Sequence, residues 1–469
     1  MRYISTRGQA PALAFDDVLL AGLARDGGLY LPETWPSLEP ERLKSFRGRP
    51  YAKVAAEVMR PFVAGSVIEA RFEELVREAY AGFEHPAVAP LRQLDANDWL
   101  LELFHGPTLA FKDVAMQFLG RLFDAVLEAR DARITILGAT SGDTGAAAVE
   151  AFAGRSRIDL FILHPENRVS EVQRRQMTTV QAENVHNLAI QGTFDDCQDL
   201  VKACFNDHAF RDALQLSAIN SINWARVMAQ IVYYVTAALS LGAPERAVSF
   251  AVPTGNFGNV FAGHAARAMG LPIDRLVVGS NSNDILARFF ERGEMAIGPV
   301  QPTLSPSMDI QVSSNFERLL FELLGKDGAE VARVLTDFRK EGRFTIAPEL
   351  HRRVLEGFEG FRLDDAGTLQ EIARCHAACG EVIDPHTAVG LAAARARRGD
   401  PAVPMVTLAT AHPAKFPDAV EQAIGLRPQL PPRLADLLER PERLQVMAAD
   451  EEGLKAYLRA HARVALEAA

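Results

Sequence analysis

The stretch ITILGATSGDTGAAAVEAFAG (residues 134–154) contains the pattern on which the fold depends. Residues 134–140 are mostly apolar or β-branched, which favours a β-strand. Gly, Ser, Asp and Thr then form a turn, and an Ala-rich segment with a strong preference for helix follows. The stretch therefore predicts a strand, a turn and a helix in direct succession.

The same alternation returns along the chain after about residue 95. Four further apolar runs end in turn residues and precede a helical pattern: DLFILHP (159–165), VSFAVPTGN (248–256), LVVGSN (276–281) and MVTLATAH (405–412). Repeated strand, turn and helix predict an α/β architecture with mostly parallel sheets. In such sheets ligands bind at the carboxyl ends of the strands, where these Gly-rich turns gather.

The two ends of the chain have a different pattern. Helical periodicity dominates the first part, as in VIEARFEELVREAYAGF (67–83), and prolines precede a boundary near residues 90–97. After Leu426, the Pro-rich RPQLPPRL leads into an Ala-, Glu- and Arg-rich helical tail. We expect these segments: an N-terminal domain at 1–95, a catalytic region at 96–430 with lobes at 134–215 and 216–430, and a helical segment at 431–469.

Composition limits the possible partners. The chain has 469 residues, 48% of them hydrophobic, and 50 Lys+Arg against 60 Asp+Glu give a net charge of −10. This apolar content excludes a mainly disordered chain. The net negative charge and the lack of a basic block disfavour nucleic acids and anionic membranes as the main binding partners. The apolar stretch from Ala225 to Leu241 contains Arg226 and Gln230 and is too short to span a membrane. Without a signal-peptide pattern, we expect a soluble cytoplasmic protein.

The cysteines do not predict a metal site. The chain has four, and Cys375 and Cys379 flank His376 at a spacing that puts both thiols on one helix face. A zinc site needs more ligands than this motif offers, so buried free thiols and no metal are the better prediction.

The motif PTGNFGN (253–259) lies between an apolar run and a helical pattern. Gly255 and Gly258 let backbone N–H groups approach a ligand closely, and the following helix N-terminus favours an anion such as phosphate. The motif is neither a Walker loop nor GxGxxG, so a nucleotide is poorly supported. A tight turn with no ligand is the alternative.

Lys112 follows an apolar triplet in HGPTLAFKD (105–113) and precedes an amphipathic helical pattern. Most lysines are solvated, so a surface residue at a helix start is the plain interpretation. However, Phe111 and Val114 flank it with bulk, and a desolvated lysine loses its proton readily and forms imines. Lys112 is therefore a candidate catalytic residue, although Asp113 opposes simple desolvation.

Two further motifs offer polar groups at strand ends. In ATSGDTGAAA (139–148), hydroxyls and backbone donors at a helix start suit a carboxylate or phosphate, or simply cap the helix. In LATAHPAKF (408–416), Thr410 ends a strand. Its hydroxyl can exchange a hydrogen bond with an aromatic nitrogen; alternatively, it bonds its own backbone.

In IDPHTAVG (383–390), Asp384 and Pro385 match a helix N-cap, and we interpret His386 as structural.

Together these motifs suit one cofactor. Pyridoxal phosphate needs a lysine for an imine, a phosphate cradle, a partner for its ring nitrogen and a site for the substrate carboxylate. The chain offers a candidate for each of these four needs.

At this point the motifs match a known family. The chain resembles threonine synthases, pyridoxal-phosphate lyases of fold type II (tryptophan synthase β-like), in the branch with an extended N-terminal domain. The matching stretches run along nearly the whole chain: YISTRG, DGGLYLPE, HGPTLAFKD, TSGDTG, VSEVQRRQMTT, NSINWARVMAQ, PTGNFGN, SNDILARFF, LSPSMDIQVSSNFERLLF, IDPHTAV and TAHPAKF. The resemblance implies two α/β lobes with mostly parallel sheets plus an N-terminal domain.

The resemblance also implies roles for individual residues. Lys112 would hold the cofactor covalently and later move protons, and Thr410 would face the pyridine nitrogen. The cofactor phosphate would be cradled by Gly255, Asn256, Phe257, Gly258 and Asn259. The substrate carboxylate would lie at Ser141, Gly142, Asp143 and Thr144. Weaker candidates for the substrate region are Asn220, Ser221, Asn223 and Arg226, with Arg226 and Lys415 as partners for its phosphate.

The implied reaction is the last step of threonine biosynthesis. O-phospho-L-homoserine and water become L-threonine and phosphate by β,γ-elimination and replacement. Many relatives in the wider fold group have Asn where this chain has Asp143, and an ionised Asp would be repelled by the cofactor's phenolate-like oxygen. We therefore expect Asp143 to be turned away, protonated or paired with a cation.

Two alternatives stay open at this stage. A dehydratase-like enzyme of the same cofactor class would release an oxo acid and would lack a pocket for a substrate phosphate. A catalytically silent homologue acting as a binding protein is disfavoured because both Lys112 and PTGNFGN are present. The expected assembly is a monomer or a homodimer.

Overall fold

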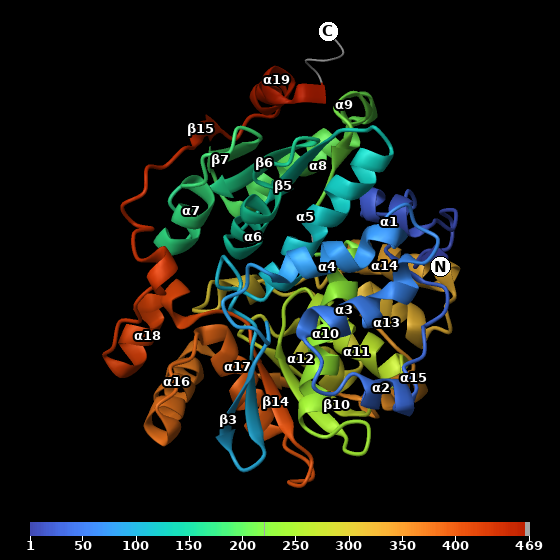
Figure 1. Ribbon diagram of the computed structural model, residues 1–469, viewed down its shortest axis with the longest axis vertical. Helices are drawn as coiled ribbons and strands as arrows, with labels where there is room; N and C mark the ends of the chain where they lie inside the picture. Colours follow the sequence, from blue (N-terminus) through green and yellow to red (C-terminus); the bar gives the residue numbers. More distant parts are fainter. Residues whose placement is uncertain (220, 465–469) are drawn as a thin grey trace.

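The computed structural model describes residues 1–219 and 221–464, and two mainly parallel sheets dominate it (Figure 1). Every apolar run singled out in the sequence forms a strand in one of these sheets. The corresponding strands are β5 (Ile134–Ala139), β6 (Ile158–Pro165), β9 (Val248–Pro253), β10 (Ile273–Ser280) and β14 (Met405–Ala409). The predicted α/β class is therefore confirmed.

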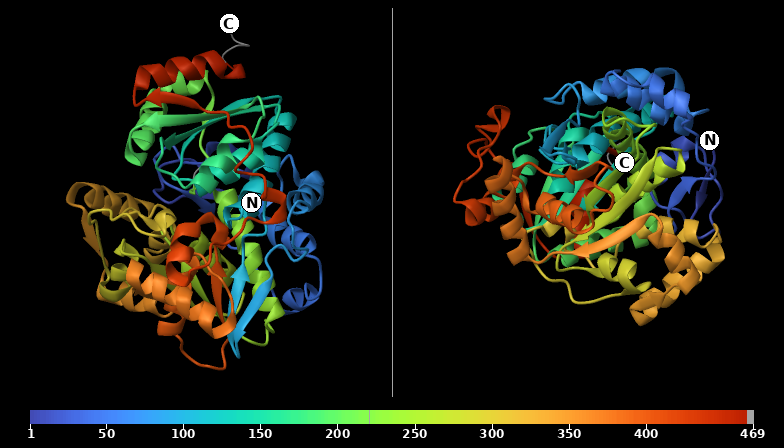
Figure 2. Two further views of the ribbon diagram at one scale, coloured as in Figure 1. Left: turned by 90° about the vertical axis from the view of Figure 1, so that its left-hand side faces the viewer. Right: turned by 90° about the horizontal axis from the view of Figure 1, so that it is seen from below.

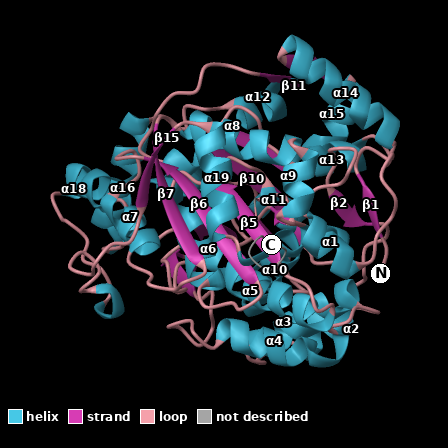
Figure 3. Ribbon diagram, turned by 90° about the horizontal axis from the view of Figure 1, so that it is seen from above, coloured by secondary structure: helices cyan, strands magenta, loops and turns pink. Residues whose placement is uncertain are grey.

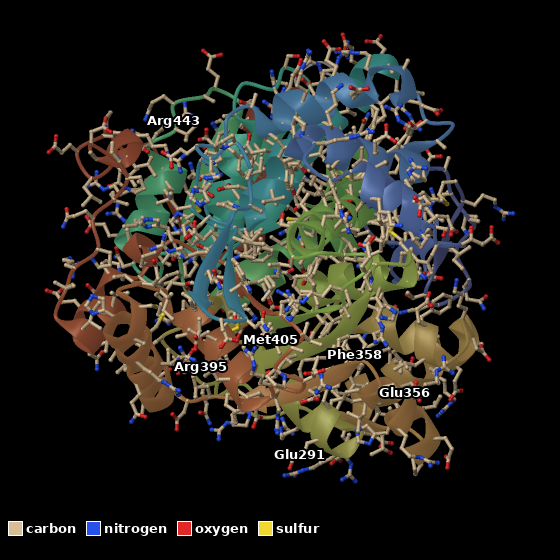
Figure 4. The ribbon with its side chains drawn as sticks, turned by 60° about the horizontal axis from the view of Figure 1, so that its bottom comes forward. Glu291, Glu356, Phe358, Arg395, Met405 and Arg443 are labelled. Atoms are coloured by element: carbon tan, nitrogen blue, oxygen red, sulfur yellow. The ribbon has the colours of Figure 1, made fainter. Side chains whose placement is uncertain are left out.

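The larger sheet has six strands in the order β13-β10-β9-β14-β4-β3. Besides β9, β10 and β14 it contains β3 (Leu91–Asp95), β4 (Asp98–Glu102) and β13 (Phe358–Arg362). Neighbouring strands are parallel except for β3 and β4, which form an antiparallel hairpin at one edge. Figure 4 labels Met405 on β14 and Phe358 on β13 in this sheet, and both side chains are buried.

The smaller sheet has five parallel strands in the order β15-β7-β6-β5-β8, visible from above in Figure 3. It adds β7 (Val185–Gln191), β8 (Leu216–Ser217) and β15 (Gln445–Ala448) to β5 and β6. Both faces are covered, because Leu160 and Ile162 belong to the main core while Phe161 and Leu163 pack in a cluster with Leu454. Burial on both faces explains why β6 is a nearly continuous apolar run.

Helices surround the two sheets. They are α1 (Phe15–Ala21), α2 (Pro40–Ser45), α3 (Tyr51–Met59), α4 (Phe72–Tyr80), α5 (Lys112–Ala129), α6 (Asp143–Phe152), α7 (Glu171–Thr178), α8 (Phe194–Asn206), α9 (His208–Ala213), α10 (Trp224–Ser240), α11 (Gly258–Ala268), α12 (Ile285–Arg292), α13 (Phe316–Leu323), α14 (Gly328–Glu341), α15 (Pro348–Leu355), α16 (Asp365–Cys379), α17 (Pro385–Ala396), α18 (Pro417–Ile424) and α19 (Glu451–His461). Short 3₁₀ turns lie at η1 (Arg60–Val63), η2 (Glu69–Arg71), η3 (Pro306–Met308), η4 (Pro413–Lys415) and η5 (Pro432–Leu434).

The N-terminal region shares its core with the rest of the molecule. It contains the small antiparallel pair β1 (Tyr3–Ser5) and β2 (Tyr30–Pro32) besides its helices, and a second such pair, β11 (Glu294–Ala296) with β12 (Arg343–Thr345), lies further along the chain. The rings of Tyr3 and Phe62 lie 6.1 and 5.6 Å from that of Trp224 on α10. The continuous core also includes residues of α3, α4, α5 and α11. Residues 1–95 therefore share one continuous core with elements around both sheets.

The C-terminal segment is more than the helical tail that the sequence predicts. It runs from the larger lobe up to the smaller one (Figure 2) and adds β15 to the edge of the small sheet, beside β7. Arg443, labelled in Figure 4, donates from its backbone N–H to Thr178 O (2.6 Å) and from its guanidinium to Val185 O (2.8 Å). The amino-acid composition of this segment favours helix and gives no sign of β15, because the strand has only four residues and three of them are exposed.

The proposed domain boundaries remain predictions. In two places a strand of one predicted segment pairs with a strand of another. The strand β3 lies within the predicted segment 1–95 yet pairs with β4 of the large sheet, and β15 of the tail pairs within the small sheet. Among the described residues, no helix is both long and apolar enough to cross a membrane.

Candidate active site

Lys112 is the first residue of α5, at a turn that is bonded to the end of β14. The Phe111 N–H donates to Thr410 O at 2.9 Å, and Ala110 forms a bridge with Ala411. Only 9% of Lys112 is exposed, which excludes the plain interpretation of a solvated surface lysine. The fold therefore brings Lys112 and Thr410 together from positions about 300 residues apart.

Asp143 is the partner of the Lys112 amine. It opens α6, and its Oδ2 lies 3.1 Å from Lys112 Nζ. Lys415 Nζ lies 2.9 Å from Oδ1. Gln173 Nε2 donates to Oδ1 at 2.8 Å and Ser307 Oγ donates to Oδ2 at 3.1 Å. We expected Asp143 to be turned away, protonated or paired with a cation. In the structure it is paired with the amines of Lys112 and Lys415.

Together, burial and the neighbouring charges lower the pKa of Lys112 and that of Asp143. Burial lowers the pKa of Lys112; the Asp143 carboxylate opposes this effect, while the charges of Lys415 and Arg226 add to it. Burial alone would raise the pKa of Asp143, but the Lys112 and Lys415 ammonium groups hold it well below its usual value. Lys112 thus loses its proton more readily than a solvated lysine, as a nucleophilic amine requires.

The loop 253–259 connects β9 to α11 and forms a backbone cradle. Phe257 adopts a left-handed conformation (φ 63°), and its ring packs in the core against Phe316 and Phe290. This side chain anchors the loop, so only its backbone is available to a ligand. A Cβ on Gly255 would lie 3.0 Å from Met308 Cα, and one on Gly258 would lie 3.2 Å from Asn315 Nδ2. Both positions require glycine for a close approach.

The two asparagines of the loop differ. Asn259 is buried, and its Oδ1 accepts hydrogen bonds from the hydroxyls of Tyr233 and Tyr234. Its Nδ2 is buried without a partner among the described residues. Asn256 is exposed and accepts from Ser314. The unpaired amide of Asn259 and the start of α11 both offer hydrogen-bond donors, as a phosphate cradle needs.

Residues of the segment 303–315 hold this cradle, and the motif analysis did not identify them. Ser313 Oγ donates to Gly255 O at 2.7 Å, and Asn315 Nδ2 donates to Asn256 O at 3.1 Å. Asp309 in turn accepts bonds from Asn281, Asn283 and Thr303, which hold the segment in place. The concentration of Ser, Asn and Asp in LSPSMDIQVSSN was the available signal.

Arg226 is a buried cation without a carboxylate partner among the described residues. It lies in the first turn of α10, is 3% exposed, and within residues 1–219 and 221–464 its guanidinium makes one long bond, from Nη1 to Ile219 O (3.4 Å). Its Nε is buried and unpaired. Burial lowers the pKa of Arg226 to about 10. A buried guanidinium is costly unless an anion pairs with it, so Arg226, whose charge acts on Lys112, is a candidate for binding an anion.

The other residues of NSINWAR divide into two groups. Asn223 is fully buried and caps α10, since its Oδ1 accepts from Ala225 N and its Nδ2 donates to Leu19 O. Ser221 is partly exposed, with its hydroxyl 3.4 Å from that of Ser314. Asn220 lies outside the described residues. Asn223 therefore has a structural function here, while Ser221 stays a candidate.

The turn 140–145 brings its predicted residues to the start of α6. Thr140 Oγ1 accepts from the N–H groups of Gly142 and Gly145, so this hydroxyl closes the turn. A Cβ on Gly142 would lie 2.4 Å from the Gln173 side chain. Ser141 and Thr144 are partly exposed at the helix N-terminus, where a carboxylate is favoured.

Lys415 has a different environment from the one expected. It is fully buried, and its Nζ donates to Thr108 O (2.7 Å) besides pairing with Asp143. An amine with these two partners holds Asp143 in place, which favours this function over binding the substrate phosphate. The sequence alone could not show that the amine has these two partners.

Comparisons with known proteins agree with this geometry. Residues 2–80 match the family described as threonine synthase N terminus, 84–337 match pyridoxal-phosphate dependent enzyme, and 387–458 match threonine synthase, C-terminal. A threonine synthase from Pseudomonas aeruginosa is 56% identical over 98% of both chains. The chain belongs to the threonine synthase family. A Corynebacterium glutamicum relative of the same name is 43% identical over 98% of both chains.

Solved structures show the same relationship. A PLP-bound threonine synthase from Brucella melitensis superposes with a TM-score of 0.96 at 55% identity, covering 99% of this chain and all of that one. The yeast enzyme gives 0.93 at 37% identity over 98% of both chains. A tomato threonine deaminase gives 0.51 at 11% identity, which shows a shared fold alone. The chain is thus a fold type II pyridoxal-phosphate enzyme with an N-terminal domain, as expected.

The site also fits the cofactor on its own geometry. A buried amine with a lowered pKa, a loop in which a Cβ at Gly255 or Gly258 would be crowded, and a buried amide at a helix start that is unpaired among the described residues are present together. Within residues 1–219 and 221–464, no group of three His, Cys, Asp or Glu side chains is placed to hold a metal ion. The thiols of Cys375 and Cys379 are 3.9 Å apart on α16 and both are free.

We predict that Asp113 makes stability depend on pH. Asp113 is fully buried beneath the Lys112 turn and accepts from Thr108 N and Oγ1. Burial raises its pKa from 3.8 to about 6, against the bonds from Thr108. The raised pKa means that its contribution to folding is complete below about pH 4 and is lost as the pH rises through 6, by about 3 kcal/mol.

Asp113→Asn imitates the protonated carboxyl and should lack this dependence. The test compares the unfolding free energies of wild type and variant between pH 4 and 7. The wild type should lose stability relative to the variant as the pH rises. A difference that stays constant over this range would contradict the assignment.

Proposed function

We propose that the chain converts O-phospho-L-homoserine and water to L-threonine and phosphate, with Lys112 as the catalytic amine. The observation that supports this substrate most is Arg226, a buried cation that has no carboxylate partner in the described part of the chain and that acts electrostatically on Lys112. A phosphorylated substrate supplies the anion that this guanidinium lacks. Arg also suits a phosphate because its planar fork can donate two hydrogen bonds to it.

Each part of the substrate has a proposed partner. The start of α6, with Ser141, Gly142 and Thr144, offers backbone and hydroxyl donors to the α-carboxylate. Arg226 binds the phosphate. Thr410, whose backbone is bonded to the Lys112 turn, is the proposed partner of the cofactor ring nitrogen. These roles are supported by burial and proximity to Lys112.

Bound pyridoxal phosphate supplies an electron sink for negative charge that develops on the substrate carbons. Lys112 holds the cofactor and, once released, takes a proton from the substrate α-carbon at Nζ. Its lowered pKa means that Nζ is freed of its own proton more readily than in a solvated lysine, as a proton acceptor requires. Asp143 remains ionised beside it and stabilises Nζ in its protonated form until the proton moves on.

The nearest alternative is a dehydratase-like activity that releases an oxo acid. Incubation with O-phospho-L-homoserine, with phosphate, threonine and 2-oxobutyrate followed together, distinguishes the two. Equal amounts of phosphate and threonine are expected. Phosphate with 2-oxobutyrate would support the dehydratase, and no turnover would support a silent binding protein.

We further propose a cytoplasmic enzyme that acts as a monomer or a homodimer. All four cysteines are free thiols, as is usual in a reducing compartment. Lys112, Asp143, Lys415 and Arg226 all come from one chain, so a monomer can assemble the described site. Light scattering on the loaded enzyme measures the assembly directly.

Gly255→Ala should weaken cofactor binding. The new Cβ would lie 3.0 Å from Met308 Cα and 3.2 Å from Ser307 O, so the loop must move away from its clamp. We expect the dissociation constant for pyridoxal phosphate to rise about tenfold or more, since a change of 1.4 kcal/mol suffices for this. Gly82→Ala is the matched control, because a Cβ there meets nothing within 4 Å. Equal affinity in the two variants would contradict the cradle.

A further inference from the structure

A chain of hydrogen bonds connects His386 to Asp143, although the sequence analysis treated His386 as structural. Its first link is at the active site, where Oδ2 of Asp143 has two partners, Lys112 Nζ and Ser307 Oγ, each at 3.1 Å. When the Lys112 amine is engaged elsewhere, Ser307 is the partner that remains at this oxygen. Lys415 and Gln173 hold the Oδ1 atom, and the position of Ser307 therefore helps to set where Oδ2 points.

The second link fixes the tautomer of His386. The Ser307 N–H donates to His386 Nε2 at 3.3 Å, so Nε2 is an acceptor and the ring proton is on Nδ1. Nδ1 lies 2.8 Å from Asp384 Oδ1 and donates to it. Asp384 is fully buried at the N-cap of α17, where it also accepts from the N–H groups of His386 and Thr387.

The ring of His386 is held from its other side as well. It is 4% exposed, and its centroid lies 4.7 Å from that of Phe416. Asp384 and Phe416 together leave the imidazole a single orientation, with Nε2 toward the η3 turn. An acceptor is thus presented to Ser307 by rigid elements of the larger lobe.

We propose that His386 is a positioning residue, which holds Ser307 over Asp143 so that the carboxylate keeps its place beside Lys112. The inference rests on the proposed role of Lys112. It extends the site to the start of α17, with Asp384 orienting His386 and Ser307 transmitting the position to Asp143.

The chief alternative is that His386 merely anchors the segment 303–315. This segment has independent anchors, because Asp309 accepts from Asn281, Asn283 and Thr303, and Ser313 donates to Gly255 O. Loss of the His386 acceptor should therefore leave the segment in place and displace Ser307. The two interpretations predict different results for variants along the chain of bonds.

The groups around Asp143 and His386 determine in which direction the pH of proton loss from Lys112 Nζ should change. Asp143 is faced by Lys112 on α5, Lys415 on η4 and His386 on α17, and Arg226 on α10 acts on Lys112. His386, whose ring proton is on Nδ1, is faced by Asp384, and Asp309 of the neighbouring segment lies within electrostatic range of it. The Ser307 bond draws negative charge from Oδ2. Without it, the carboxylate attracts a proton on Lys112 Nζ more strongly, so that proton should leave at higher pH.

The experiment uses loaded enzyme and follows the absorbance of the lysine-bound cofactor against pH. His386→Phe removes the acceptor and keeps the ring, while His386→Gln restores an acceptor near Nε2. We expect His386→Phe to raise the midpoint by about half a pH unit or more, a change of at least about threefold in proton affinity. His386→Gln should restore the wild-type midpoint.

Ser307→Ala tests the next link without altering His386. It should raise the midpoint as His386→Phe does, and the double variant should show no further rise, because both changes remove one interaction. Thr303→Val removes the hydrogen bonds of that hydroxyl with Asp309, Asn281 and Ser305 and touches no link between His386 and Asp143, so it should leave the midpoint unchanged. Ser307→Ala also covers the case in which His386→Phe does not fold.

The inference would be overturned by an unchanged midpoint in Ser307→Ala, by additive shifts in the double variant, or by a shift in Thr303→Val of the same size. A wild-type enzyme whose cofactor is not bound through Lys112 would instead overturn the proposed function. Borohydride trapping of the wild type separates these two failures.

Discussion

Lys112→Ala should abolish covalent attachment of the cofactor and reduce kcat by about 10³-fold or more. Lys112 is the buried amine with a lowered pKa between the cradle and Asp143, so its loss removes both the attachment point and the proton carrier. The measurement is borohydride reduction followed by peptide mass analysis. Wild type should carry the cofactor on the peptide containing Lys112, and the variant should carry none.

Lys112→Arg is the matched control for charge. It keeps a cation beside Asp143, so the ion pair and the fold should be preserved, yet a guanidinium forms no imine. Both variants should therefore lose attachment and turnover, while Lys112→Arg retains more of the wild-type melting temperature. A reducible linkage that persists in Lys112→Ala would show that another amine holds the cofactor.

Arg226→Met should lower the activity toward the phosphorylated substrate without lowering the melting temperature. Because the guanidinium is buried and lacks a carboxylate partner among the described residues, replacing it with an apolar side chain should leave the melting temperature equal or a few degrees higher. The kcat/KM for the phosphorylated substrate should fall about 10²- to 10³-fold, because the substrate phosphate loses a buried charge partner. Arg226→Lys should recover part of that loss.

The matched control for this prediction is Arg318→Met. Arg318 is also a fully buried guanidinium with a lowered pKa of about 9, but it donates to Tyr30 O, to Ile222 O (2.6 Å) and to Asn315. Its removal takes these hydrogen-bond donors away from the buried Tyr30 carbonyl and from Asn315 and should lower the melting temperature by several degrees. If Arg226→Met lowers stability as much as Arg318→Met, then Arg226 is a structural residue.

The parts of the fold that could be predicted are those with a strong local pattern. The strands β5, β6, β9, β10 and β14 are apolar on both faces and end in turn residues, so each one was recognisable alone. The strand β15 was not, because it is short, largely exposed and formed by pairing with β7. The shared core of the N-terminal region likewise depends on contacts such as Tyr3 with Trp224, which no local pattern reports.

The candidate site shows the same division. Lys112, the cradle loop and the turn before α6 lie in continuous motifs whose composition indicates their chemistry. Their partners Gln173, Ser307 and Asn315 come from other segments, and ordinary polar residues carry no signal of a contact 30 to 164 positions away. Lys415 lies in a motif that the sequence singles out, but the motif does not show that its amine pairs with Asp143 and donates to Thr108 O. These two contacts favour holding Asp143 over binding the substrate phosphate.

The late position of β15 has a consequence for how the protein emerges from the ribosome. The small sheet can form once residue 217 has been made, but the edge of β7, which ends at residue 191, stays open until residue 448 follows. At about 5–20 residues per second, the 231 residues from 217 to 448 (448 − 217) take roughly 12 to 46 seconds to synthesise. Throughout that interval an apolar strand edge is exposed to pairing with other nascent chains. Among the described strands, the last to be translated is thus the one that covers the open edge of the small sheet.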